Sequence, residues 1–295
     1  MNEPTAVLRL KVGGAWVTRV VEQYAAGFAP DYLFPDWNPI VRFQLPQLFG
    51  PTSYDSADNK LIFSIHCWII QTASHTILID TCTGNHNSRP SLPRAHGLET
   101  TFLDRLATYV ALDDVDFVLC THLHAHHCGW NTRLVEERWQ PTFPNAKYVF
   151  SKVEHDHLAG PLGRTGLLNG IYEDSVLPII ESGQALLFEG GVSIVDDLSI
   201  HPAPGHSPGQ VTVNLRSEGE EAVFCGDVMH QPIQIYRPNW NSRFCQAPEA
   251  ARSSRRALLE YAADRKATVF TGHFPLSAAG RVGRDADVFT WSYVT

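Results

Sequence analysis

The sequence predicts a mixed α/β fold in which two β-sheets pack as a sandwich flanked by helices. Short β-branched and aromatic runs recur along the chain, as expected of strands. Segments with helical spacing of apolar residues lie between them. The strands form two groups, each joined to helices, which is typical of a layered α/β domain. At 295 residues, a single domain spanning 1–295 is expected, because α/β cores of this size are commonly undivided.

The first part of the chain is predicted to be all β. Residues 6–22 and 60–80 each contain two β-branched runs separated by Gly-Gly or by a polar turn, so each predicts a β-hairpin. Between them, residues 28–55 carry aromatics and prolines without a regular period. This irregular segment is interpreted as a lid or dimer contact, or equally as an ordinary loop packed on the core.

Beyond Asp80 the pattern changes to alternating helices and strands. Residues 98–110 have helical spacing and residues 115–122 read as a buried strand. An amphipathic helix is predicted at 247–265. Further strands are predicted at 148–151, 185–188, 192–195, 210–215, 221–227 and 267–273.

Composition restricts the class of function. The formal net charge is −8 and Lys and Arg do not cluster, which argues against nucleic acid or an anionic membrane as partner. A small-molecule substrate is therefore favoured. The sequence has neither an export signal nor a long apolar run, so a cytoplasmic location is expected. The six cysteines form no CxxC pair, which favours buried reduced thiols.

Histidines and an aspartate follow the ends of predicted strands in four segments: THLHAHHCG, APGHSPG, CGDVMH and TGHFP. Loops that follow strand ends are common positions for catalytic groups. Four histidines within six positions are difficult to explain by packing, because each buried imidazole needs polar partners. Imidazole nitrogen and carboxylate oxygen together suit Zn, Fe or Mn. The pattern therefore predicts a metal site.

The order of these motifs resembles the metallo-β-lactamase superfamily. The resemblance covers about residues 60–275, and length and flanking character are most similar to its lactonase and methyl-parathion-hydrolase branches. It implies an αββα four-layer sandwich and a metal-dependent hydrolase. The motifs that carry it are Asp80, His122-x-His124-x-x-His127, His206 in PGHSPG, Asp227 in CGD and His273 in GHF.

The resemblance also implies a ligand set. His122, His124 and His206 would bind a first metal ion, His127 and His273 a second, and Asp227 would bridge them. Two zinc ions per chain are expected, with iron or manganese as alternatives. Asp80 would either orient a ligand imidazole by accepting its N–H, or simply occupy a strand-end turn. Water acidified by the metals, to a pKa of about 7, would attack a carbonyl or phosphoryl centre.

The sequence departs from the superfamily at His126, where HxHxDH has aspartate. His126 could bind the second metal through a neutral nitrogen, turn away and leave that site weak, or retune the site toward another chemistry. A neutral ligand leaves more positive charge on the metals, which further acidifies bound water but weakens retention of the second ion. The sequence alone does not distinguish natural variation from an introduced substitution.

Three functions follow as hypotheses. The first is a hydrolase of a small ester, lactone, amide or phosphotriester, with Asp227, His126 and His230 in catalysis. His230 is interpreted as a substrate contact or oxyanion donor, or as a structural residue. The second is a non-heme iron oxidoreductase on the same fold. The third is a metal-binding protein whose catalysis is impaired by His126. A homodimer is also considered.

Overall fold

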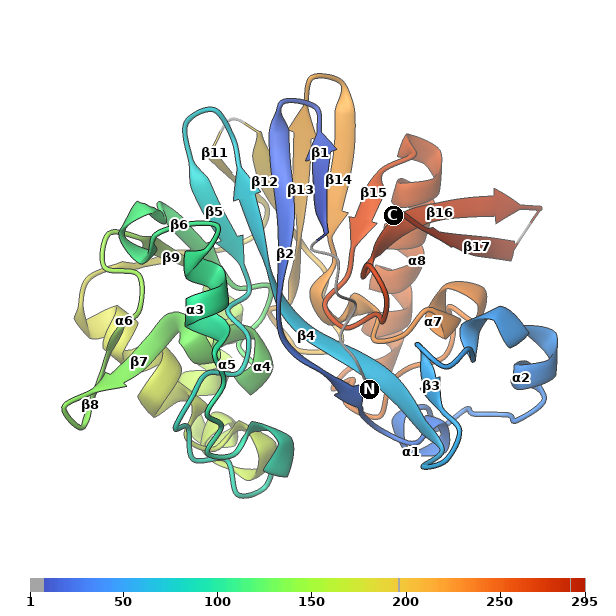
Figure 1. Ribbon diagram of the computed structural model, residues 1–295, viewed down its shortest axis with the longest axis horizontal. Helices are drawn as coiled ribbons and strands as arrows, with labels where there is room; N and C mark the ends of the chain where they lie inside the picture. Colours follow the sequence, from blue (N-terminus) through green and yellow to red (C-terminus); the bar gives the residue numbers. More distant parts are fainter. Residues whose placement is uncertain (1–7, 196, 287, 295) are drawn as a thin grey trace. The chain divides into compact units, whose positions relative to one another are not determined.

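The computed structural model describes residues 8–195, 197–286 and 288–294 (Figure 1). The chain divides into two compact units. The central unit comprises Arg9–Glu22 and Ile65–Val192. The C-terminal unit contains the described residues of Gln23–Ser64 and Ser193–Thr295. Across the described residues, no helix has the length and apolar character needed to cross a membrane.

The strands of the central unit belong to a mixed eight-stranded sheet, whose order is β1-β2-β4-β5-β6-β9-β10. The eighth strand, β3, pairs with residues 60 and 61 of β4, in the C-terminal unit. Both predicted hairpins are confirmed as antiparallel pairs, β1 with β2 and β4 with β5, although residues 6 and 7 lie outside the described part. The strands β5, β6, β9 and β10 are parallel neighbours. Strand bounds are β1 Arg9–Val12, β2 Ala15–Ala26, β3 Tyr54–Asp55, β4 Lys60–Gln71, β5 Thr76–Ile79, β6 Phe117–Leu119, β9 Lys147–Ser151 and β10 Ala185–Phe188.

The parallel part of this sheet positions the histidine motif. Carboxyl ends of adjacent parallel strands lie at the same edge of a sheet, and ligands gather at such edges. Asp80 follows β5 directly, and residues 120–124 follow β6. Both chemically active segments of the central unit therefore start at one edge of the sheet.

Short helices and one hairpin complete the central unit. The helix predicted at 98–110 is confirmed in a shorter form, α3. A π-helix at Tyr172–Val176 and the hairpin of β7 and β8 were not predicted. The bounds are η2 Pro93–Ala95, α3 Phe102–Ala107, η3 Leu112–Asp114, α4 Ala125–Cys128, η4 Gly129–Asn131, β7 Thr132–Val135, β8 Arg138–Pro141, α5 Lys152–Ala159, η5 Pro161–Arg164, η6 Gly166–Leu168, η7 Tyr172–Val176 and α6 Leu177–Glu181.

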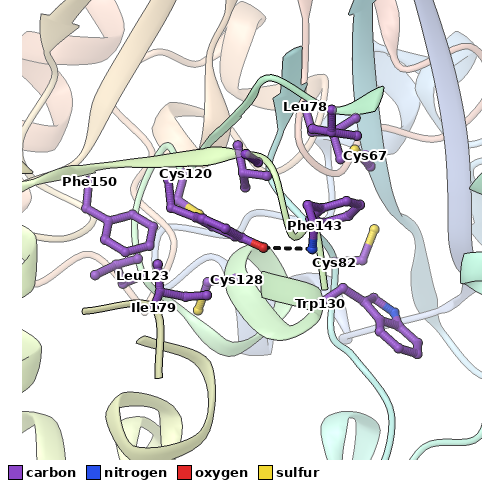
Figure 2. Packing of buried hydrophobic residues seen from close by; sticks show 14 of the residues in the cluster. Cys67, Leu78, Cys82, Cys120, Leu123, Cys128, Trp130, Phe143, Phe150 and Ile179 are labelled. Atoms are coloured by element: carbon purple, nitrogen blue, oxygen red, sulfur yellow. Dashed lines mark hydrogen bonds between the residues drawn. The ribbon is translucent and has the colours of Figure 1, made fainter. Parts of the chain in front are cut away.

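A hydrophobic cluster lies in the core of the central unit, and part of it is drawn in Figure 2. Four cysteines lie in it: Cys67, Cys82, Cys120 and Cys128. Burial raises the pKa of these thiols, so they act as small apolar side chains. The buried Tyr148 hydroxyl accepts a hydrogen bond from the Phe143 amide at 3.0 Å and donates one to the Asn131 carbonyl.

The C-terminal unit contains a mixed seven-stranded sheet of order β11-β12-β13-β14-β15-β16-β17. Strands β14 and β15 are parallel, and the chain passes between them through the predicted amphipathic helix, α8. Asp227 follows β14 and His273 follows β15, so both start from the carboxyl edge of this pair. The bounds are β11 Val192–Val195, β12 Leu198–Pro202, β13 Val211–Ser217, β14 Glu220–Phe224, η8 Gly226–Val228, α7 Ile233–Tyr236, α8 Pro248–Arg265, β15 Thr268–Phe270, β16 Ala279–Asp285 and β17 Val288–Tyr293.

The segment predicted as irregular, residues 28–55, folds into short elements of the C-terminal unit. These are α1 Pro30–Leu33, α2 Val41–Gln44, η1 Pro46–Leu48 and β3. Proline occupies the first turn of α1 and of η1, where its missing N–H costs nothing. Leu33, Phe34 and Val41 are buried in a second hydrophobic cluster with Ile233. The role of residues 28–55 as a lid or dimer contact stays a prediction.

The mixed α/β class is thus confirmed, with two large mixed sheets accompanied by helices. The main errors concern the ends of strands. The strand predicted at 221–227 ends at Phe224, because the chain turns into η8, and the one predicted at 267–273 ends at Phe270. Polar residues beyond those points belong to the loops that carry the candidate ligands.

Candidate metal centre

Four imidazoles gather in the loop that follows β6. His124 is the N-cap of α4 and has extended backbone, with φ −77° and ψ 156°. His126 and His127 then lie within α4. Ring centroids are 4.5 Å apart for His122 and His124, and 4.1 Å for His122 and His127. The His126 ring lies 4.3 Å from that of His127.

Asp80 fixes the protonation of one of these imidazoles. The Asp80 carboxylate is buried and accepts hydrogen bonds from the amide of Thr121 at 2.7 Å and from its hydroxyl. Its Oδ2 lies 2.8 Å from Nδ1 of His127. Because a carboxylate can only accept, Nδ1 of His127 carries the proton and Nε2 retains its lone pair. This is the tautomer and orientation that a metal ligand requires.

In the C-terminal unit, three imidazoles surround the Asp227 carboxylate. Nε2 of His273 lies 2.8 Å from Oδ1 of Asp227, while Nε2 of His206 and Nε2 of His230 lie 3.2 and 3.4 Å from Oδ2. All four residues are at most 3% exposed. A carboxylate buried to this extent requires compensating positive charge or hydrogen-bond donors.

The surroundings of His273 indicate that a cation fits at Asp227. Nδ1 of His273 lies 3.2 Å from the carbonyl oxygen of Ser64, an acceptor only, so this nitrogen carries a proton. With Nδ1 protonated, neutral His273 would point its Nε2 lone pair at a carboxylate oxygen 2.8 Å away. Two acceptors at that distance repel each other unless a proton or a metal ion lies between them. The donor set therefore suits a metal.

His230 is the third imidazole on Asp227. Burial lowers the pKa of His230, although the negative charge of Asp227 opposes this shift. Its Nε2 also lies 3.4 Å from the hydroxyl of Ser242, a residue that sequence analysis missed. Within the described residues, its buried Nδ1 has no hydrogen-bond partner. The imidazole is therefore placed beside Asp227 with one nitrogen still available to a ligand.

The Asp227 loop is anchored from α8 by a buried arginine that the sequence did not single out. The Arg255 guanidinium is completely buried and donates to the carbonyls of Val228, Pro238 and Trp240. It also donates to Oδ1 of Asn241 at 3.1 Å. Its position on the buried face of an amphipathic helix is the one sequence signal that could have identified it.

The predicted ligands are thus divided between the two units. His122, His124, His126 and His127 belong to the central unit, and His206, Asp227 and His273 to the C-terminal unit. Each half therefore contains imidazoles, and the C-terminal unit also a carboxylate, of the type that could hold a metal ion. Asp80 and His230 each lie against one of these donors.

Comparisons with known proteins give a consistent picture. The sequence model of the metallo-β-lactamase superfamily matches residues 62–273. No curated protein matches the chain. Among solved structures, a dizinc quorum-quenching lactonase named AidC, with a homoserine product bound, has a TM-score of 0.81 at 21% identity and covers 100% of this chain and 99% of its own.

Two further solved structures are similar. A hydrolase of the β-lactamase superfamily named AbOPH has a TM-score of 0.83 at 20% identity, covering 100% of this chain and 99% of its own. A probable metal-dependent hydrolase from Staphylococcus aureus has a TM-score of 0.78 at 20% identity, covering 97% of this chain and 100% of its own. At these identities the likeness concerns the fold.

Proposed function

Because the chain belongs to the metallo-β-lactamase superfamily, we propose that it is a metal-dependent hydrolase of a small ester, lactone, amide or phosphotriester. The observation that carries the proposal is the short distance from Nε2 of His273 to the Asp227 carboxylate while Nδ1 faces a carbonyl. A metal ion held by both side chains would satisfy the two acceptors, and membership of the superfamily makes a metal the expected occupant.

We propose that the two halves described above combine into one dinuclear centre. His122, His124, His206 and Asp227 would hold one ion. His126, His127, Asp227 and His273 would hold the other. Zinc is the expected metal, at two ions per chain, and iron or manganese would suit the same nitrogen and oxygen donors.

In the proposed centre, His126 replaces the anionic ligand of the superfamily with a neutral one. The second ion would then be held by three imidazoles and the shared Asp227 carboxylate. A less negative ligand set retains a dication less strongly, so the second site should be the weaker of the two. Weaker binding of the second metal ion is how His126 would alter or impair the activity of the enzyme.

The protein's own groups would orient the centre. A metal bound there would acidify water for attack on the substrate and stabilise the oxyanion that develops. Asp80 keeps the proton on Nδ1 of His127, and the Ser64 carbonyl does the same for His273, so both imidazoles present Nε2. His230, beside Asp227, is proposed to contact the substrate or donate to the oxyanion.

The substrate class follows from charge and from the similar structures. A net charge of −8 disfavours polyanionic substrates, because they would be repelled at long range. One similar structure is a lactonase with its homoserine product bound. We therefore place N-acyl-homoserine lactones first among the candidates, followed by aryl esters and neutral phosphotriesters.

The test is a metal analysis of the purified chain followed by an assay panel. The expected result is two zinc equivalents and hydrolysis of at least one substrate class, abolished by a chelator and restored by zinc. Bound iron with oxygen consumption would favour the oxidoreductase alternative. Two bound metals without turnover of any class would favour the impaired protein, and a chain that binds no metal would refute the proposal.

A further inference from the structure

Glu22, near the middle of β2, has a buried carboxylate that the proposed chemistry does not use. The side chain is 6% exposed. Its Oε2 accepts the amide of Thr83 at 2.8 Å, and its Oε1 accepts the amide of Gly84 at 3.2 Å. Oε1 also accepts the indole N–H of Trp130 at 2.6 Å and the hydroxyl of Thr100 at 3.4 Å. The carboxylate is therefore surrounded by donors.

The loop that faces Glu22 has an unusual backbone. Alternate residues are left-handed: φ is 58° at Asp80, 56° at Cys82, 82° at Gly84 and 65° at His86. Three of these four are not glycine, and such residues adopt positive φ only where their surroundings hold them there. Backbone of this kind can point neighbouring N–H groups at one anion. Here the anion is supplied by Glu22.

The same loop is hydrogen-bonded to the end of the histidine motif. The Thr81 amide donates to the His127 carbonyl at 2.7 Å, and the Trp130 amide donates to the Thr81 carbonyl at 3.0 Å. The Gly129 amide donates to the Cys82 carbonyl at 2.8 Å. A Cβ on Gly129 would lie 1.7 Å from the carbonyl oxygen of Thr83, so only glycine allows this approach.

We infer that Glu22 is a positioning residue for the candidate metal centre. Its carboxylate holds the left-handed loop 80–86, and the loop in turn sets Asp80 against Nδ1 of His127. Trp130 takes part at both ends, because its indole binds Glu22 and its backbone binds Thr81. The consequence for metal binding rests on the proposed function, whereas the consequence for the loop does not.

The experiment compares the full-length wild type with Glu22→Gln, which keeps the shape but puts an amide against N–H donors. In the metal-free protein, amide hydrogen exchange of residues 80–88 and the ¹⁵N shifts of the His127 imidazole are measured. We expect faster exchange and loss of the protonated Nδ1 signature. In the cobalt-loaded protein, we expect affinity for Co²⁺ to fall roughly 10- to 100-fold, as for other groups that orient ligands.

Three further variants separate positioning from general stability. Glu22→Asp keeps the charge and should recover part of the Co²⁺ affinity. Trp130→Phe removes one of the donors to Glu22. It should change the amide exchange, the His127 signature and the Co²⁺ affinity in the same direction as Glu22→Gln, but by a smaller amount. Ile179→Ala, in the core of the same unit and remote in sequence from the loop, is the control for lost stability. It should lower the thermal midpoint while leaving the His127 signature intact.

The inference is overturned if Glu22→Gln leaves the exchange of residues 80–88 and the His127 signature unchanged. The inference is also overturned if Ile179→Ala changes the exchange of residues 80–88 and the His127 signature as much as Glu22→Gln does, when the two variants lose the same thermal stability. A wild type that binds no Co²⁺ would instead refute the proposed function, and the metal-free measurements would still decide the role of Glu22.

Discussion

Asp80→Asn is the substitution that most directly tests the metal-ligand assignment in the central unit. The Asp80 Oδ1 accepts the Thr121 amide at 2.7 Å, and Oδ2 faces Nδ1 of His127 at 2.8 Å. An asparagine can keep its oxygen toward Thr121 only by turning its NH₂ group toward His127. That imidazole must then accept at Nδ1 and carry its proton on Nε2, the nitrogen that is needed for metal.

The size of the effect can be worked from these contacts. Loss of a hydrogen bond to a charged group costs about 1.5–3 kcal/mol. Each 1.4 kcal/mol corresponds to about a tenfold change in an equilibrium constant. We therefore expect one metal ion per chain to bind about 10- to 100-fold more weakly, which is also the range found for groups that orient metal ligands.

The assay is competition for zinc with a chromophoric chelator at neutral pH, using wild type and Asp80→Asn at equal concentration. Asp116→Asn is the matched control, because Asp116 also accepts a backbone amide, that of Thr76 at 2.7 Å, in the same unit. The control should bind zinc as the wild type does. Unchanged affinity of both sites in Asp80→Asn would refute the reasoning.

Four further predictions concern metal retention, stability and thiols. His126→Asp should raise the zinc content after dialysis toward two per chain, because an anionic donor replaces a neutral one; a fall would contradict this. Removing metal with a chelator should lower the thermal midpoint, since a ligand at 100 times its Kd stabilises the native state by about 2.7 kcal/mol; an unchanged midpoint would argue against a bound ion. Arg255→Met should reduce the free energy of unfolding in urea by roughly 3 kcal/mol, because buried carbonyls lose charged donors. A change below about 1 kcal/mol would show that the Asp227 loop does not depend on the Arg255 guanidinium. Burial raises the pKa of Cys67, Cys82 and Cys120, so less thiolate is present at any given pH. Mass spectrometry should therefore show that iodoacetamide alkylates these thiols at pH 8 only after denaturation. Rapid labelling of the native chain would contradict this prediction.

Much of the fold and of the candidate ligand set was accessible from the sequence alone. Pairs of β-branched runs separated by Gly-Gly or by a polar turn predicted the hairpins at β1–β2 and β4–β5, because both strands and their turn lie within one short segment. The segments around His122, His206, Asp227 and His273 were recognisable because their residues are close together in sequence and follow buried strands. Local pattern suffices for features that local geometry determines.

Other parts of the candidate centre depend on the tertiary structure. The bond from His127 to Asp80 spans 47 residues, that from Trp130 to Glu22 spans 108, and that from His273 to Ser64 spans 209. Nothing in the local sequence marks Glu22 or Ser64 as a partner. Likewise, positive φ at Asp80, Cys82 and His86 runs against their intrinsic preference.

The sequence by itself therefore determined which donors this protein has and which strand each one follows. The tertiary structure decided which nitrogen of His127 and of His273 carries the proton, and which buried groups hold the ligand loops. The physical reason is that ligand identity is a property of a residue, whereas tautomer and orientation are set by hydrogen bonds between segments that only folding brings together.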